Sequence, residues 1–275
     1  MTAQHILFKS VRITDAESSF NGQEVDVWIE EGIIQDIGPR LKPSEPYQTV
    51  DATCISPVWV DAWNHGAAPK EEHRQSVADW HEDALAAGLG LVQVSAADHN
   101  PAHEVSAWEG LRSHYAQGPV VCIPLASLSR DHSGEDFSDL LSLAEAGACG
   151  FSDGPNHVVR PERLELALRY LSVQTKAVWT SLQKPMPQKP VHEGQIHLEL
   201  GVKGSPAWEE EQALQQAIAL VQASGGSLVV PVLSVPAEHV RSRNLVLGTS
   251  ALHLAFDEHA LMGFETRYKQ WPVLR

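Results

Sequence analysis

Short apolar runs alternate with amphipathic segments along most of the chain. The runs of strand length are 55–60, 89–94, 120–124, 148–152, 176–180 and 227–233, with a weaker one at 244–247. The segments between them place apolar residues at helical spacing, as in the stripe of Phe137, Leu140, Leu141 and Ala144. Strands that alternate with amphipathic helices predict an α/β fold with a parallel sheet and right-handed crossovers.

The number of predicted strands reaches six or seven before the sequence ends at Arg275. A closed barrel of this type has eight parallel strands. The pattern therefore predicts an incomplete or distorted TIM-type (β/α) barrel, apparently truncated before the eighth strand. An open parallel edge carries unpaired N–H and C=O groups, so we expect another subunit or a local rearrangement to cover it. A homo-oligomer is the expected state.

Residues 1–53 have a different pattern. The stretches HILFKSVRI, EVDVWIE and IIQDIG are β-type runs, and Glu31-Gly32 marks a turn between the last two. Pro39, Pro43 and Pro46 interrupt the segment after the third run. We therefore expect a small β subdomain over residues 1–53 and the barrel over residues 54–275.

The clearest helix start in the sequence is near Ser205. This residue is expected to be the N-cap, with Pro206 in the first helical position. The acidic stretch Glu209 to Glu211 comes next, where carboxylates favour the positive end of the helix dipole. Gly225-Gly226 is expected to end this helix.

Charge and cysteine content narrow the possible partners and the compartment. The chain has 35 acidic and 20 basic residues and a net charge of −15, which disfavours binding to nucleic acid or to an anionic membrane. Its apolar runs are shorter than the roughly 20 residues that span a bilayer. Cys54, Cys122 and Cys149 form no CxxC pair and are expected to be small buried thiols in a reducing compartment. We therefore expect a cytoplasmic protein.

The end of the first predicted barrel strand carries the strongest chemical signal. Asp61, Trp63, Asn64 and His65 come after the apolar run, and chemistry in α/β barrels lies at the carboxyl ends of the strands. A D-x-H-x-H sequence would place two imidazoles on one side of the strand and could chelate a metal. Trp63 occupies the first of those positions, and indole offers a metal no lone pair. A plain hydrogen-bonded role for His65 is the alternative interpretation.

Other polar positions support weaker interpretations. Asp153, in Phe-Ser-Asp-Gly after the fourth strand, is either a functional carboxylate or a turn residue. Asp98, His99 and His103 are either ligands or loop and capping residues. His81, flanked by acidic residues, is expected on a solvated helix face.

Several collinear segments together resemble the dihydroorotases of the cyclic amidohydrolase superfamily. Residues 25–37 (VDVWIEEGIIQDI) resemble the opening β hairpin of these enzymes, and residues 145–154 (EAGACGFSDG) resemble their fourth-strand signature. Residues 192–206 (HEGQIHLELGVKGSP) are similar to their fifth loop, and the final segment resembles one that finishes in K-x-x-PPLR. The resemblance implies a barrel of amidohydrolase type.

The same resemblance implies which positions would hold metal and substrate. Family members interconvert carbamoyl aspartate and dihydroorotate with two zinc ions and a bridging hydroxide. The corresponding positions here are Trp63, His65, Ala67, Ala97, Asp153, Thr180 or Ser181, and Val232, which lies two residues before Ser234. His65 and Asp153 keep a ligand type as vestigial positions, whereas Trp63, Ala67 and Val232 have lost the family's side chain. A further family Asp, the proton shuttle, would lie beyond Arg275.

Two hypotheses about function result. In the first, the chain is a dihydroorotase homologue without catalytic residues or bound metal, which serves as a structural or regulatory partner in pyrimidine biosynthesis. Some members of the resembled family lack the metal ligands and bind aspartate carbamoyltransferase, so that enzyme is the candidate partner. In the second, the chain is a working cyclic amidohydrolase with a one-metal zinc site built from His65, Asp153 and His99. The residues leave open whether the chain is an enzyme.

Overall fold

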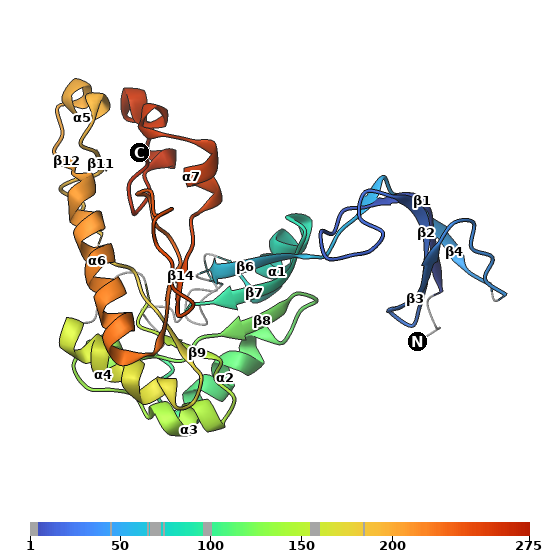
Figure 1. The fold of residues 1–275 in the computed structure, drawn as a ribbon, viewed down its shortest axis with the longest axis horizontal. Helices are drawn as coiled ribbons and strands as arrows, with labels where there is room; N and C mark the ends of the chain where they lie inside the picture. Colours follow the sequence, from blue (N-terminus) through green and yellow to red (C-terminus); the bar gives the residue numbers. More distant parts are fainter. Residues whose placement is uncertain are drawn as a thin grey trace. The chain divides into compact units, whose positions relative to one another are not determined.

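Two separate units, Met1–Trp59 and Val60–Arg275, make up the chain in the computed structural model (Figure 1). The structure describes residues 5–44, 46–64, 66, 73, 75–95, 101–154, 160–183 and 185–275. Each unit contains its own sheet and its own group of buried apolar side chains. The two units are therefore described one at a time.

The first unit is a five-stranded sheet. Its strands are β1 (Ile6–Ile13), β2 (Glu24–Glu30), β3 (Ile33–Gly38), β4 (Gln48–Val50) and β5 (Cys54–Ile55). Strands β2 and β3 pair antiparallel across Glu31 and Gly32, which both have positive φ, as a tight hairpin turn requires. Val11, Val25 and Val27 form the centre of a small core. The expected β character of this segment and its turn are confirmed.

The second unit carries a run of strands in sequence order. These strands are β6 (Trp59–Asn64), β7 (Leu89–Val94), β8 (Val121–Pro124), β9 (Gly150–Ser152), β10 (Ala177–Trp179), β13 (Ser227–Val230) and β14 (Leu245–Leu247). One sheet has the order β6-β7-β8 and the other has the order β9-β10-β13-β14. The pairs β7–β8, β9–β10, β10–β13 and β13–β14 are all parallel. A parallel bridge between Ala126 and Phe151 connects the two sheets. The predicted α/β fold with an incomplete barrel is confirmed.

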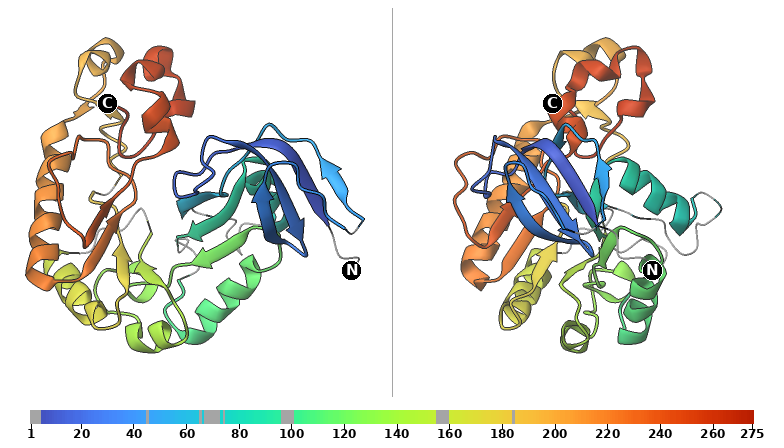
Figure 2. Two further views of the ribbon diagram at one scale, coloured as in Figure 1. Left: turned by 45° about the vertical axis from the view of Figure 1, so that its right-hand side comes forward. Right: turned by 90° about the vertical axis from the view of Figure 1, so that its right-hand side faces the viewer.

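Helices cover the outer side of these strands (Figure 2). They are α1 (Val77–Ala86), α2 (Val105–Tyr115), α3 (Leu140–Glu145), α4 (Pro161–Ser172) and α6 (Ala207–Ser224). Leu140 and Ala144 of the predicted stripe are buried on α3. Trp108 and Leu111 on α2, and Leu164 and Leu168 on α4, also face inward and are buried. Gly225 ends α6 in a left-handed conformation, as expected.

A small lobe lies at the carboxyl end of the strands. It contains β11 (Val191–His192), α5 (Gln195–Leu200) and β12 (Gly204–Ser205), and it packs against the C-terminal segment with α7 (Ala251–Ala255), η2 (Glu258–Phe264) and η3 (Thr266–Tyr268) (Figure 1). Val191, Ile196 and Leu261 form its separate core. None of this lobe was expected from the sequence pattern.

Three local expectations were wrong. The first barrel strand runs from Trp59 to Asn64 and not over 55–60, and it ends the sheet order, so it has a strand neighbour on one side only among the described residues. Ser205 lies in β12, and Pro206 occupies the N-cap of α6 without a capping side chain. Cys54 is exposed, because it lies in the short edge strand β5.

Among the described residues, no helix has both the length and the apolar character that a bilayer span requires.

Candidate functional site

The end of strand β6 is shaped by hydrogen bonds from Asp61. Its two carboxylate oxygens accept from the backbone N–H of Trp63 at 3.0 Å and from the side-chain amide of Asn64 at 3.0 Å. The carbonyl of Asn64 accepts from the N–H of Ser95, just after β7, at 2.7 Å. Asp61 thus fixes the backbone that presents the Trp63 side chain.

A cavity of about 330 Å³ lies at the carboxyl ends of the strands. Its lining residues are Trp63, Ser181, Pro185, Val232, Ser250, Gln270, Trp271 and Pro272. Trp63 comes from β6, Ser181 lies just after β10, and Val232 lies just after β13. Trp63 and Val232, which the family resemblance marks as former ligand positions, therefore meet in one cavity with Ser181, one of the two residues that correspond to the fifth-strand ligand. Carboxyl ends of parallel strands converge in this way in α/β barrels.

The C-terminal segment forms one wall of this cavity through Gln270, Trp271 and Pro272. The indole N–H of Trp271 donates to the carbonyl oxygen of Gln183 at 3.2 Å. His253 donates from Nε2 to the carbonyl oxygen of Pro272 at 3.0 Å and accepts at Nδ1 from the Ser250 hydroxyl at 2.7 Å. Hydrogen bonds to Gln183 and to His253 therefore hold Trp271 and Pro272 in place.

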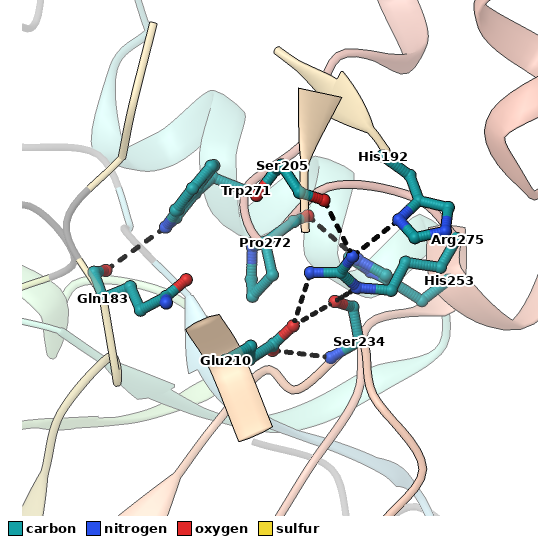
Figure 3. A network of polar contacts seen from close by, with 9 residues as sticks. All are labelled: Gln183, His192, Ser205, Glu210, Ser234, His253, Trp271, Pro272 and Arg275. Carbon is teal, nitrogen blue, oxygen red and sulfur yellow. Dashed lines mark hydrogen bonds and ion pairs between the residues drawn. The ribbon is translucent and has the colours of Figure 1, made fainter. Parts of the chain in front are cut away.

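Arg275 anchors the same segment through its guanidinium group (Figure 3). Nη2 lies 3.1 Å from Oε2 of Glu210, and Nε donates to the Ser234 hydroxyl at 2.8 Å. Nη1 donates to Nδ1 of His192 at 2.7 Å and to the carbonyl oxygen of Ser205 at 3.1 Å. The Glu210 carboxylate also accepts from the backbone N–H of Ser234 at 2.9 Å. A charge pair this buried is stable only when such additional bonds satisfy both ions.

Asp153 lies directly after strand β9 and is buried. Its Oδ1 accepts from the N–H of Ser129 at 2.7 Å, and its Oδ2 accepts from the Ser129 hydroxyl at 2.6 Å. The Ser129 hydroxyl in turn accepts from the N–H of Gly134 at 2.8 Å. Both carboxylate oxygens therefore already hold short hydrogen bonds to a neighbouring loop.

That loop has an unusual backbone. Asp131 and His132 are consecutive non-glycine residues with φ of 53° each, a conformation that costs energy for residues with a Cβ. The buried ring of His132 lies 2.9 Å from the Ser127 hydroxyl through Nε2, which offsets part of that cost. The loop is thus held in the shape that presents Ser129 to Asp153.

Among the remaining candidates from the sequence, His103 and Thr180 are described and do not line this cavity. His65, Ala67, Ala97, Asp98 and His99 lie outside the described residues. Nδ1 of His103 lies 4.0 Å from a carboxylate oxygen of the exposed Asp131. Thr180 is buried, and its hydroxyl donates to the carbonyl of Ser181 at 3.1 Å.

His81 was expected on a solvated helix face, and this expectation was wrong. The ring is buried, with Nε2 3.0 Å from the carbonyl oxygen of Tyr115. It packs against Gly118, which has no side chain to interfere. The neighbouring Glu82 and Asp83 are exposed, so the local charge pattern misled the sequence interpretation.

The described residues do not fit a zinc pair. Within the described ranges, no group of three or more His, Cys, Asp or Glu side chains is placed to hold a metal ion. Indole and isopropyl groups at Trp63 and Val232 have no donor atom for zinc, and a zinc site needs three or four such donors. The described side chains that line this cavity therefore offer too few donor atoms for a zinc pair of the family type.

Sequence reasoning missed the Arg275–Glu210 pair. Glu210 is separated from Arg275 by 65 positions, and no periodicity signals that an acidic residue in the first turn of a helix is buried. The signal that could have found Arg275 was its position at the end of the family-like segment. Gln270 and Trp271, which line the cavity, carried no signal in the sequence.

Comparison with known proteins yields distant relatives over nearly the whole chain. No protein-family model matches. A dihydroorotase from Desulfotalea psychrophila is 25% identical over 280 residues, covering 98% of this chain and 66% of that protein. A putative dihydroorotase from Rhodopirellula baltica is 28% identical over 237 residues, covering 82% and 52%. The chain thus spans about two thirds of the first of these relatives and about half of the second.

Solved structures with the same fold are amidohydrolases. The L-hydantoinase (dihydropyrimidinase) from Arthrobacter aurescens aligns with a TM-score of 0.78 at 15% identity, over 98% of this chain and 63% of that one. A dihydropyrimidinase from Brevibacillus agri aligns with a TM-score of 0.69 at 18% identity, over 99% and 63%. At these identities the solved structures show that the chain shares their fold, and the dihydroorotases are its distant relatives in sequence.

Proposed function

We propose that this chain is a dihydroorotase-like protein whose metal-binding positions have been replaced, and that it acts in pyrimidine biosynthesis as a structural or regulatory partner. A cytoplasmic location is part of this proposal. The distant dihydroorotase relatives support the pyrimidine-related character. The composition of the cavity supports the loss of catalysis.

The observation that carries the proposal is the convergence of Trp63, Ser181 and Val232 on one cavity. An active member of the resembled family would have imidazoles at the positions of Trp63 and Val232 and at that of Thr180 or Ser181. Here they are an indole, a hydroxyl and an isopropyl group. Without enough nitrogen and oxygen donors, a metal cannot be held firmly enough to lower the pKa of a bound water and make it a nucleophile.

Asp153 is the retained carboxylate, and its hydrogen bonds favour a structural role. To bridge two metal ions it would have to exchange its short bonds to Ser129 for metal contacts. Those bonds are worth more than ordinary ones because the acceptor is charged and buried. Asp153 therefore serves to hold the loop at Ser129 in this proposal.

The test measures zinc content and dihydroorotate hydrolysis on the purified chain after incubation with zinc, with an active dihydroorotase assayed alongside. We expect no tightly bound zinc and no hydrolysis above the buffer rate. Asp153→Asn is the comparison variant, and we expect it to leave both readings unchanged. Hydrolysis by the unaltered chain would overturn the proposal.

A second candidate is the one-metal amidohydrolase. It is favoured by one observation, the presence of a buried carboxylate, Asp153, directly after a barrel strand. It predicts about one zinc ion per chain, lost in Asp153→Asn together with hydrolysis. The same measurement therefore separates the two candidates.

The proposed partner role rests on the two ends of the strand order. Strands β6 and β14 end the order, and among the described residues no strand pairs with their outer edges. Val60 and Val246 on these strands are exposed. Unpaired parallel edges bind other chains readily, so we propose a homo-oligomer, with aspartate carbamoyltransferase as a candidate second partner.

Light scattering on the purified chain tests the proposed homo-oligomer, and we expect a mass of at least two chains. Co-elution with aspartate carbamoyltransferase from the same organism tests the second. A monomer that does not co-elute would remove the partner role, whatever the zinc measurement shows.

A further inference from the structure

We propose that the cavity between Trp63 and Trp271 binds an uncharged aromatic ring that carries an amide-like hydrogen-bonding edge. This inference rests on the proposed function, since it takes the positions 63, 181 and 232 to be free of metal. It adds the chemical class of a ligand. The shape, rigidity, polarity and charge of the cavity each contribute to it.

The walls of the cavity suit a flat ring. Trp63 and Trp271 line it together with Pro185, Pro272 and Val232. Aromatic faces attract other rings beyond the gain from burying apolar surface. At about 330 Å³ the cavity is at the small end of the range of roughly 300–1,000 Å³ that ligand pockets occupy. It therefore suits one ring with a small substituent.

The wall formed by the C-terminal segment is already fixed in position. Trp271 is held by its bond to Gln183, and the carbonyl of Pro272 is held by His253 (Figure 3). Arg275 anchors the end of the segment at Glu210. A pre-organised wall loses little conformational entropy when a ligand enters.

Two polar side chains supply the hydrogen-bonding edge. The Gln270 amide offers a donor and an acceptor, and the Ser181 hydroxyl offers both as well. Both residues line the cavity. Within the described part of the chain neither side chain makes a hydrogen bond, whereas the Ser250 hydroxyl is already engaged with His253. An amide on the ligand, which has one donor side and one acceptor side, matches this edge.

Charge disfavours an anionic ligand. The cavity lining contains no Asp, Glu, Lys or Arg among the described residues. The guanidinium of Arg275 makes four hydrogen bonds, to Glu210, Ser234, His192 and Ser205, and its charge is paired with the Glu210 carboxylate. The net charge of −15 adds a repulsive background, and an unpaired carboxylate would lose its hydration on entry.

The test uses three probes that differ in one property each: benzamide, benzoate and cyclohexanecarboxamide. Calorimetric titration of the full chain, after treatment with a chelator, measures their affinity. We expect benzamide to bind at least tenfold more tightly than benzoate, which lacks the neutral amide, and than cyclohexanecarboxamide, which lacks the flat ring. Equal or tighter binding of benzoate, or no binding of benzamide at millimolar concentration, would overturn the inference.

Two variants locate the site. Gln270→Leu removes the hydrogen-bonding edge, and Trp63→Leu removes one indole; each should weaken benzamide binding at least fivefold. Trp208→Phe, on the exposed face of α6, is the control and should bind as the unaltered chain does. If Trp63→Leu does not fold, Gln270→Leu decides the question, and unchanged binding there contradicts the inference.

The zinc measurement keeps this inference distinct from the proposed function. A chain that binds zinc and hydrolyses dihydroorotate removes the proposed function, and the inference with it. If the chain binds no zinc, does not hydrolyse dihydroorotate and does not bind benzamide, the proposed function stands and the inference alone is wrong.

Discussion

The guanidinium of Arg275 lies 3.1 Å from the carboxylate of Glu210, and their side chains are 11% and 2% exposed. This contact joins the end of the chain to the first turn of α6, far away in the sequence. It also holds in place the segment that carries Trp271. The pair therefore links the stability of the second unit to the shape of the cavity.

We predict that Arg275→Ala destabilises the protein by about 3–5 kcal/mol, because removal of one partner leaves the other charge buried. Urea denaturation measures the change. Arg267→Ala is the matched control, since its pair with Glu265 is exposed, and it should leave the urea midpoint nearly unchanged. Equal effects from the two variants would show that the Arg275 pair is not buried in solution.

We predict that Asp153→Asn destabilises the protein by about 1–3 kcal/mol. The substituted amide nitrogen would face one of the two donors of Ser129, which then loses its acceptor. Asp131→Asn makes the same chemical change on an exposed carboxylate, and Asn tolerates the positive φ there. The free energy of unfolding of that control should stay within about 0.5 kcal/mol of the value for the unaltered protein. A thermal unfolding series with both variants gives the answer, and no difference between them would contradict the structural role of Asp153.

We predict that Cys54 reacts with a thiol reagent at pH 8 long before the other two cysteines. Cys54 is exposed. Burial raises the pKa of the Cys122 thiol to about 11, and it also raises the pKa of the Cys149 thiol. A raised pKa lowers the thiolate fraction, so at pH 8 roughly one in a thousand Cys122 thiols is ionised and reactive. Cys54→Ser should abolish the fast phase, and a fast phase of more than one thiol per chain would disprove the assignment.

We predict opposite effects for two glycine substitutions. A Cβ at Gly150 would lie 2.2 Å from the Trp179 ring and 3.0 Å from the carbonyl oxygen of Ala177, so Gly150→Ala should destabilise the barrel by about 1–3 kcal/mol. Gly110, inside helix α2, has nothing within 4 Å of that position. Gly110→Ala should therefore stabilise by about 0.5–1 kcal/mol. Denaturation curves for both variants test this, and a shift of the same sign in both would count against the packing described at Gly150.

The strands could be predicted from the sequence because their signal is local. The run 89–94 coincides with β7, and the run 227–233 contains β13, since a strand buried among neighbours must be apolar over its own few residues. Edge strands give a weaker signal. Strand β6 mixes Asp61 and Asn64 with apolar residues, and for this reason its predicted position, 55–60, was too early in the chain.

The site was only partly predictable, because the signals that a sequence carries are local. Trp63 and Val232 could be marked as altered positions because they fall in segments that resemble a known family. The wall at Gln270 and Trp271 could not be found, since its place depends on contacts with Gln183 and Glu210 elsewhere in the chain. Pairings over such distances leave no periodic trace in a sequence.

The strand order has a consequence for how the protein is made. Each pairing from β7 to β8 and from β9 through β14 joins strands that succeed one another within the barrel run. During translation, each newly emerged strand therefore finds its neighbour already outside the ribosome, and the sheet grows in the direction of synthesis. The longest delay falls to β10, since β11, α5, β12 and α6 are synthesised before its partner β13.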